Sequence, residues 1–429
     1  MTLRALRTLP SIVVMAAFIG GFLSYYDFHL DFIRVLPFPA ANVFLFGLMA
    51  MVSVTLLRAA ASGSARQQVE RLYLNHVSVI LALCGIVLFS FISSFVSTAF
   101  VEIGPRYVMY PAYDAVIVLL AMLLPIRAHH RALFRPYVFI ALLALVGSVF
   151  YDAIHPGTFS VVDTRAAGFP ANPNITAFVL LALCCLIVDF ERIDFLGLIA
   201  LLLTSVGVLA TLSRGGMIML AFLVVSYTIV VARQKGRGRI RFFGTIAAVA
   251  GLGGLILLGS SQLMQRASIF SMQSQNRSAM LTGQVAIVTP QESRITLLRE
   301  SWDLIQESPF WGYGAGYTYT LEQGPHNIYI HQWLNNGIGG LLCYLWLLVA
   351  VARVFWRRRS RAGVVFIGIV SLEGLFSHNL LEERAFLVAL GVLLTMSYFH
   401  AGDFAPDRAD LPVQGRLDRL PTGSALAGD

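Results

Sequence analysis

Four short stretches of the sequence carry side chains that suit the binding of an anionic group and the transfer of a proton. They are "DTRAAGFPANPNITA" with Arg165 and Asn174, "ATLSRGGMIML" with Arg214, "SRITLLRESWDLIQE" with Arg294 and Arg299, and "GPHNIYIHQWLNNGIGG" with His326 and Asn327. A guanidinium presents a planar fork of N–H donors that matches two phosphate oxygens, and a neutral imidazole accepts a proton near neutral pH. These residue types fit a site that binds a pyrophosphate at a bilayer surface.

The histidine of the last stretch is expected in the first turn of a helix. Pro325 can begin that helix, which puts His326 and Asn327 at the positive end of its dipole. That end disfavours imidazolium and attracts anions, so a neutral His326 there is suited to act as a general base. The alternative is a histidine that only caps the helix or lies at the membrane interface. His331 is interpreted as a packing or hydrogen-bonding residue, and His378 in "FSHNLLEER" is a second candidate for the base.

An arginine also lies on the apolar face of a helix predicted over 292–307, whose start carries the capping signals Thr289, Pro290 and Glu292. At about 100° per residue, one side of this helix gathers Ile295, Leu298, Trp302 and Ile305, extended by Leu297 and Leu304. Arg294 projects into the middle of this arc and Arg299 lies at its edge. An arginine centred on an apolar face is costly unless an anion meets it. The alternatives are a nearby carboxylate partner or contact with lipid headgroups.

Two further arginines lie at the ends of apolar runs. Ser213 can cap a helix that begins at Arg214, and Gly215 and Gly216 allow a ligand or another backbone to come close. The alternative is an arginine that binds a lipid phosphate. Arg165 lies in a loop rich in Gly, Pro and Asn, where an ordinary structural role is the competing interpretation.

Composition places these residues in a membrane protein. Of 429 residues, 57% are hydrophobic and 13% are charged, and the mean hydropathy is +0.74, whereas soluble domains carry about 25% charged residues. The net charge of +8 is therefore no sign of nucleic-acid binding, because its location relative to the membrane matters more. The four cysteines lie in apolar runs without metal-ligand spacing and are interpreted as small core residues: Cys84, Cys184, Cys185 and Cys343.

Apolar runs of about 20 residues recur along the chain and predict an all-α, polytopic protein with about twelve transmembrane helices. The predicted spans are 9–27, 36–57, 74–98, 110–126, 134–153, 173–190, 193–212, 214–232, 242–261, 328–352, 362–381 and 385–401. With both termini inside, the inner segments hold 22 of the 31 lysine and arginine residues, so the charge bias fixes this orientation. Residues 1–401 form one membrane domain, and 402–429 a polar cytoplasmic tail that is predicted to be disordered.

One outer segment, 262–327, is long and partly helical, while the other connections are short. It holds four arginines and five acidic residues, so it is not a general basic surface. "GYGAGY" (312–317) superficially resembles a phosphate-binding loop, but it lacks the strand–turn–helix context that a nucleotide site needs. Its glycines are expected to fold the loop tightly over the membrane surface.

The motifs, in this order, resemble the O-antigen ligase/polymerase superfamily of bacterial envelope glycosyltransferases. "RAAGFPANPNITA" is similar to an Arg…Gly…Asn-Pro-Asn segment, and "LSRGG" to a Ser-Arg helix start. "SRITLLRESWDLIQESPFWGYGAG" is similar to an arginine-containing helix with a Pro-x-x-Gly-x-Gly turn, and "HNIYIHQWLNNGIGG" to a His-Asn segment. Motif order, span layout and the single long outer loop agree over nearly the whole chain.

The resemblance implies a periplasmic active site in the bacterial inner membrane and transfer of a polysaccharide from undecaprenyl pyrophosphate to an acceptor. It assigns essential roles to Arg214, Arg294 and His326, with Arg165, Asn174, Asn327 and His378 as substrate-binding candidates. Arg266 and Arg299 match no motif clearly but lie in the same outer loop. His326 then takes the proton of the attacking hydroxyl and the arginines stabilise the leaving pyrophosphate, which predicts inversion.

The expected partners are undecaprenyl pyrophosphate-linked O-antigen, lipid A–core and membrane lipids, with no cofactor, ATP or metal, since no outer motif has metal-ligand spacing. A ligase is favoured because the chain is compact and carries no added outer domain. An O-antigen polymerase and a protein O-oligosaccharyltransferase use the same donor and stay as alternatives. A lipid-linked glycan transporter is expected to show polar or broken segments at mid-membrane depth, and the spans here are mostly clean.

Overall fold

The computed structural model describes residue 25 and residues 40–96, 106–124, 131–161, 165–191, 194–232, 294–321 and 323–398. These residues form α-helices and two 3-10 helices and contain no β-strand, which confirms the all-α prediction for this part of the chain. The predicted spans 9–27 and 242–261, the capping signals before residue 294, Arg266 and the C-terminal tail lie outside the described residues.

The described residues form twelve α-helices and two 3-10 helices. Their bounds are α3 (Ala40–Ala61), α4 (Gly63–Asn75), α5 (Val77–Val96), α7 (Arg106–Met122), α8 (Arg131–Ile154), α9 (Pro173–Ile187), α10 (Phe195–Ala210), α11 (Arg214–Ala232), α14 (Arg294–Glu307), α15 (Ile328–Arg357), α16 (Arg361–Glu373) and α17 (Arg384–Tyr398). The 3-10 helices are η3 (Tyr317–Tyr319) and η4 (Leu380–Glu382).

Three of the described helices are long and apolar enough to cross a membrane: Val77–Val96, Phe134–Ile154 and Ile328–Arg357. Six further apolar helices are shorter, from 10 to 17 residues. The described helices follow most of the predicted spans, but the total of twelve is not confirmed. The prediction for 362–381 was too long, because α16 ends at Glu373 and a polar loop with η4 follows.

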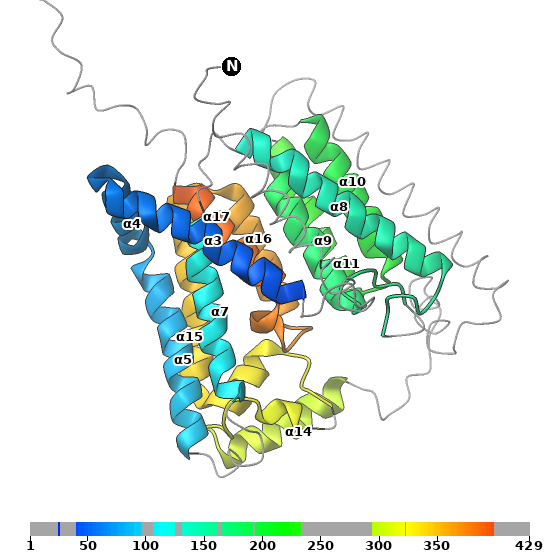
Figure 1. Cartoon of the computed structure of the whole chain (residues 1–429). Coiled ribbons are helices and arrows are strands. Elements are labelled where there is room, and N and C mark those ends of the chain that lie inside the picture. Colours follow the sequence, from blue (N-terminus) through cyan, green and yellow to red (C-terminus); the bar gives the residue numbers. More distant parts are fainter. Residues whose placement is uncertain are drawn as a thin grey trace, which may run out of the picture.

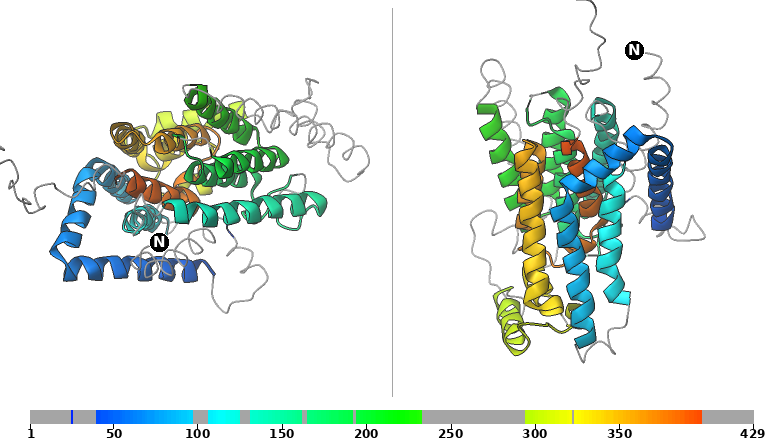
Figure 2. Two further views of the ribbon diagram at one scale, coloured as in Figure 1. Left: turned by 90° about the horizontal axis from the view of Figure 1, so that it is seen from above. Right: turned by 90° about the vertical axis from the view of Figure 1, so that its left-hand side faces the viewer.

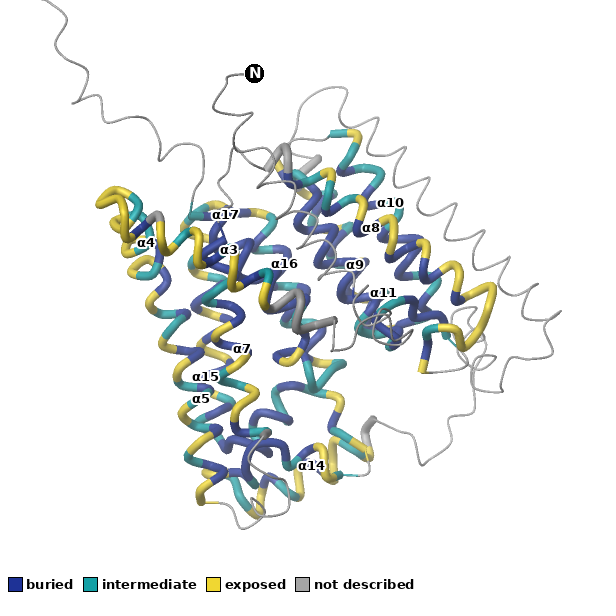
Figure 3. The backbone as a smooth tube through the Cα atoms, viewed as in Figure 1, coloured by how far each residue is buried: buried dark blue, intermediate teal, exposed yellow. Residues whose placement is uncertain are grey.

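Helix α9 lies at the centre of the fold and joins its two groups of helices. It packs against α8, α10 and α11 on one side and against α16 and α17 on the other, as Figures 1 and 2 show. Nearly every residue of α9 is buried, and it is dark blue along most of its length in Figure 3. A helix that is apolar all round belongs in such a position. The second group is built around α15, which packs along α5.

Helix α15 is broken near its start, at Gly337, and α14 is attached at this break. Gly337 has φ +65°, and the N–H of Ile338 donates to the Pro309 carbonyl at 3.1 Å. The N–H of Tyr313 donates to the Leu334 carbonyl at 2.7 Å. The break leaves backbone N–H and carbonyl groups of α15 without partners inside the helix. The glycine-rich loop after α14 forms hydrogen bonds with them, as buried backbone polar groups require.

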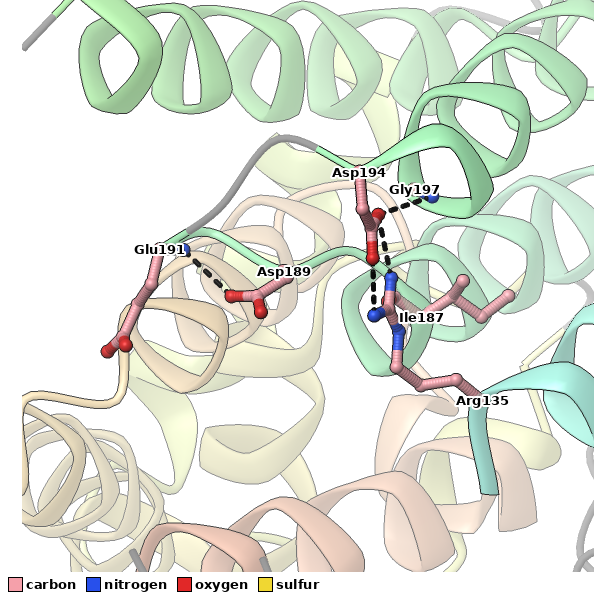
Figure 4. Close-up of polar contacts among 6 residues, drawn as sticks. All are labelled: Arg135, Ile187, Asp189, Glu191, Asp194 and Gly197. Carbon is pink, nitrogen blue, oxygen red and sulfur yellow. Dashed lines mark hydrogen bonds and ion pairs between the residues drawn. The ribbon is translucent and has the colours of Figure 1, made fainter. Parts of the chain in front are cut away.

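At the opposite end of the bundle, one arginine ties three helices together. Arg135 of α8 pairs with the Asp194 carboxylate through N–O distances of 2.5 and 2.9 Å, and its Nε donates to the Ile187 carbonyl at the end of α9 (Figure 4). Asp194 also caps α10 by accepting from the Gly197 N–H. A fork that binds a carboxylate at two points fixes both position and orientation, so the register of α8, α9 and α10 is set here.

Candidate functional site

A small pocket with a mixed polar and apolar lining lies between α5, α7, η3, the start of α15, the loop from Gly374 to Glu383 and α17. It encloses about 40 Å³, room for a few water molecules. Its polar lining includes Asp114, Gln332, Asn335, Asn336, His378 and Glu382. The start of α15, which lines the pocket, lies at the end of the bundle that carries α14 (Figure 1). By the charge bias of the sequence, this is the predicted outer end.

Three histidines meet beside the pocket although one of them, His378, is distant in the sequence from the other two. The ring centroid of His378 lies 5.3 Å from that of His326 and 5.8 Å from that of His331. His331 and His378 line the pocket, whereas His326 is exposed next to them. The sequence names all three residues, but only the fold shows that the second candidate, His378, is the one that faces the pocket.

His331 is held by hydrogen bonds at both ring nitrogens. The Asn335 amide donates to its Nε2 at 3.1 Å, so Nδ1 carries the proton of the neutral ring and donates to the Thr318 hydroxyl at 2.8 Å. Thr318 belongs to η3, so His331 fixes that turn to α15. The interpretation of His331 as a hydrogen-bonding residue is confirmed.

His378 is the histidine whose environment changes its proton affinity. Burial, together with the neighbouring His326, lowers the pKa of His378 to about 4. Its Nδ1 is buried and has no hydrogen-bond partner among the described residues. A neutral imidazole with a spare nitrogen at the wall of a pocket can accept a proton or bind a hydroxyl.

The prediction that His326 and Asn327 form the first turn of a helix is wrong. Helix α15 begins at Ile328, and Asn327 is its N-cap, with Oδ1 accepting from the N–H groups of Tyr329 and Ile330. His326 precedes the cap in a left-handed conformation, with φ +48°. The start of α15 is therefore capped by the Asn327 side chain. The positive end of the helix dipole is not directed at an anion beside His326.

A second polar cluster holds the start of α11. Arg165 donates to the Thr211 carbonyl at 3.1 Å and to Asn174 Oδ1 at 3.0 Å, and the Ser213 hydroxyl donates to the same Asn174 oxygen at 2.9 Å. The Ser213 oxygen accepts from the Gly216 N–H, which confirms Ser213 as the cap. Within the described part of the chain, Arg165 and Asn174 thus bind protein groups that position α11.

Arg214 follows this cap as the first residue of α11. Its side chain is exposed and makes no hydrogen bond or ion pair with a described residue. Gly215, next to it, faces Phe376: a Cβ built on Gly215 would lie 3.0 Å from the Phe376 ring. The start of α11 therefore lies against the loop that carries His378, only two residues further on. Arg214 and the histidines come together at one end of the bundle.

The position of Arg165 depends on a buried carboxylate below it. Asp152, which is 1% exposed, accepts hydrogen bonds from the backbone N–H groups of Phe159, Ser160, Ala167 and Gly168. These donors lie within the connection between α8 and α9, two of them before Arg165 and two after it. An ionised carboxylate that accepts several N–H bonds is well satisfied when buried, so Asp152 shapes the loop that presents Arg165.

Helix α14 forms as predicted and ends at Glu307, but its apolar arc is not its buried face. Ile305 is buried, whereas Leu298 and Trp302 are about half exposed. Trp302 packs edge-on against Trp333 of α15 at 5.8 Å. Arg299 is exposed; Arg294 begins the helix, and its side chain lies outside the description. A half-exposed aromatic row is suited to a membrane interface, which explains why an apolar arc can stay uncovered.

The sequence reasoning missed several pocket residues, chiefly Asp114, Glu382 and Tyr319. Tyr319 donates to Glu382 Oε1 at 2.5 Å and stacks on Tyr107, with centroids 5.4 Å apart. Burial raises the pKa of both Tyr319 and Glu382. Asp114 could have been identified from the sequence, because an acidic residue within an apolar span is a functional candidate by default.

A family model described as O-antigen ligase matches residues 199–345. The match covers about a third of the chain, from α10 to the middle of α15, and includes Arg214, α14 and His326. Arg165, Asn174 and His378 lie outside it. No curated protein matches the chain. Residues 199–345 are thus similar to the O-antigen ligase family model, which agrees with the resemblance that the motifs indicate.

Proposed function

We propose that this membrane protein is an O-antigen ligase of the bacterial inner membrane. It transfers the polysaccharide from undecaprenyl pyrophosphate to a sugar hydroxyl of lipid A–core at the periplasmic face. The observation that supports the proposal is the contact of Phe376 with Gly215, which sets the start of α11 against the loop that carries His378, while His378 packs against His326. The family match supports a glycosyltransferase of this superfamily.

In this proposal each group has one task. The acceptor hydroxyl loses its proton to His326 as its oxygen attacks the anomeric carbon of the donor. The bond from that carbon to the pyrophosphate oxygen breaks, and the pair of electrons leaves with undecaprenyl pyrophosphate. Arg214 and Arg294 stabilise the growing negative charge. One direct displacement inverts the anomeric carbon, and the donor bond supplies the driving force without ATP or a metal ion.

The remaining candidates have supporting tasks. Arg165 and Asn174 hold the start of α11, and so the position of Arg214, through the contacts described above. Asn327 sets the start of α15. His378 packs beside His326 and is the next candidate for the base. Arg266 and Arg299 are proposed only as additional contacts to the donor phosphates.

The test compares His326→Ala with Arg214→Ala in purified protein, measuring donor affinity and turnover separately. His326→Ala should lower turnover about 10²–10⁴-fold and leave donor affinity nearly unchanged. Arg214→Ala should weaken donor binding as well. If His326→Ala binds donor poorly but turns over the bound fraction normally, His326 is a binding residue and His378→Ala is the next variant to measure.

The nature of the acceptor separates the ligase from its relatives. A strain that lacks the gene should accumulate lipid-linked polymer and carry core-only lipopolysaccharide. Single unpolymerised repeats on the core would instead indicate a polymerase, and loss of glycoprotein alone a protein O-oligosaccharyltransferase. Turnover should persist in EDTA without nucleotide, and a loss that Mg²⁺ restores would contradict the metal-free mechanism.

A further inference from the structure

Two buried polar side chains at the wall of the pocket have no partner. Ser90 of α5 is 0% exposed, and its hydroxyl makes no hydrogen bond. Asp114 of α7 is 8% exposed and makes no hydrogen bond or ion pair with any described residue. Both line the pocket beside His378. A buried carboxylate or hydroxyl without a partner costs free energy, so each calls for a group that the pocket receives.

The charges of the pocket indicate which group that is. Its lining contains the acidic residues Asp114 and Glu382 but no lysine or arginine. Without a cation among its lining residues the pocket does not suit the donor's pyrophosphate, which the exposed Arg214 of α11 suits better. Carboxylates, amides and hydroxyls do match the hydroxyl groups of a neutral sugar, and Asn336 and Gln332 add amides to the same wall.

Aromatic rings complete the surroundings of these polar groups. Tyr107, Tyr110 and Tyr319 line the pocket, and Tyr319 is held by its hydrogen bond to Glu382 and its stacking on Tyr107. Ligand sites in proteins typically combine apolar and aromatic walls with a few placed polar groups. The enclosed volume of about 40 Å³ accommodates one edge of a sugar ring rather than a whole oligosaccharide.

We infer that this pocket is the acceptor subsite, in which Asp114 and Ser90 bind hydroxyl groups on one edge of the acceptor sugar next to His378. The inference rests on the proposed function for the identity of the reaction. It adds a division of the site: the acceptor lies between α5, α7 and α15, and the donor pyrophosphate lies towards the start of α11.

The test uses Asp114→Asn, which keeps the shape of the side chain and replaces its carboxyl group by an amide. The KM for lipid A–core should rise about 10- to 100-fold, as expected when a buried hydrogen bond is lost and its partner is left unsatisfied, with the donor KM unchanged. Ser90→Ala should raise the acceptor KM about 2- to 10-fold, since that bond is neutral. Thr204→Val, at a fully buried position of α10 outside the pocket lining, is the matched control and should change neither constant.

A binding measurement makes the inference independent of turnover. Saturation-transfer NMR with delipidated core oligosaccharide as the probe should detect binding to the wild type and to His326→Ala, but not to Asp114→Asn. An unchanged acceptor KM in Asp114→Asn and Ser90→Ala, or an increase confined to the donor KM, would overturn the subsite. Oligosaccharide binding that needs Asp114 in a protein without ligase activity would keep the subsite and refute the proposed function instead.

Discussion

Some polar side chains of the site already form hydrogen bonds with other protein groups, and others do not. His331 has both ring nitrogens bound, and Arg165 donates to Thr211 and Asn174. Replacing such a residue leaves a partner unsatisfied and disturbs the backbone. Arg214, in contrast, binds no described residue, so its removal should affect substrate more than folding. This difference lets variants at single residues separate structural from chemical roles.

Arg214→Lys should lose most activity although the charge is kept. One ammonium group cannot reproduce the two parallel hydrogen bonds that a guanidinium makes to a pyrophosphate. We expect a loss of at least about tenfold in kcat/KM for the donor, with the thermal midpoint nearly unchanged because the side chain is exposed. Arg71→Lys, on the exposed side of α4, is the control. Normal donor kinetics in a folded Arg214→Lys variant would remove Arg214 from the pyrophosphate site. Arg294→Lys is expected to behave in the same way.

The stability of the protein should decrease on acidification because of His378. Its pKa is about 4 in the folded protein and 6.5 in the unfolded chain. Between these values only the unfolded state takes up the proton, so stability is complete above pH 6.5 and is lost as the pH falls towards 4. Thermal midpoints of the detergent-solubilised protein should show this decline, and His378→Gln should reduce it. The exposed His155→Gln should retain the wild-type slope; an identical slope in His378→Gln would show that another group is responsible.

Among the elements, the break in α15 decides how the outer segment is attached. The loop after α14 fills the break, and the positive φ angles of Gly312, Gly314 and Gly316 let it turn closely against the helix. The expectation of a tightly folded glycine loop is thus confirmed. The expectation of clean spans is not met at α15. The non-helical backbone at this break is nevertheless covered by protein. Non-helical backbone within a membrane is tolerated only when it is buried in protein or lines a water-filled cavity.

Gly337→Ala should strongly destabilise the protein. A Cβ at this position would lie 2.0 Å from the Phe310 carbonyl oxygen, and the residue has φ +65°. A left-handed non-glycine residue already costs about 1–3 kcal/mol, and the backbone contact adds to that. Gly147→Ala in α8 is the matched control, because its Cβ would meet nothing within 4 Å. That variant should be neutral or gain up to about 1 kcal/mol from helix propensity. Equal thermal midpoints for the two variants would contradict this account of the break.

The elements were largely predictable because apolar length and capping residues are local properties. Ser213 caps α11, and α14 ends before Ser308, both as their sequence signals indicate. The approach of His378 to His326 was not predictable, since it depends on the end of α16 at Glu373 and on packing between distant segments. The helix α4 was also missed, because a polar helix at the membrane surface carries no apolar run. The pocket around Asp114 joins side chains from six segments and can be recognised only from the folded structure.

At the scale of the whole molecule, the two ends of the bundle are chemically different. One end carries α14 and the start of α15, whereas the other carries α4 and the end of α15 (Figure 1). There Arg358 donates to Asn75 and covers the Tyr398 ring, and Arg135 binds Asp194. Among the described residues, Arg66 and Arg71 of α4 and Arg358 at the end of α15 lie at this second end, and the positive-inside rule assigns all three to the cytoplasm. The polarity of the molecule thus matches an active site that faces away from the cytoplasm.

Cysteine labelling in cells should establish this polarity. In a variant with Cys84, Cys184, Cys185 and Cys343 replaced by alanine, Thr320→Cys places one thiol beside η3, and Gln67→Cys places one on α4; both positions are exposed. A membrane-impermeant maleimide should label Thr320→Cys in intact spheroplasts, because the charge bias puts that end outside. Gln67→Cys should react only after the membrane is permeabilised. The reverse pattern would place the histidines and Arg214 in the cytoplasm, where an outer-face glycan transfer cannot occur, and would refute the proposed ligase together with its topology.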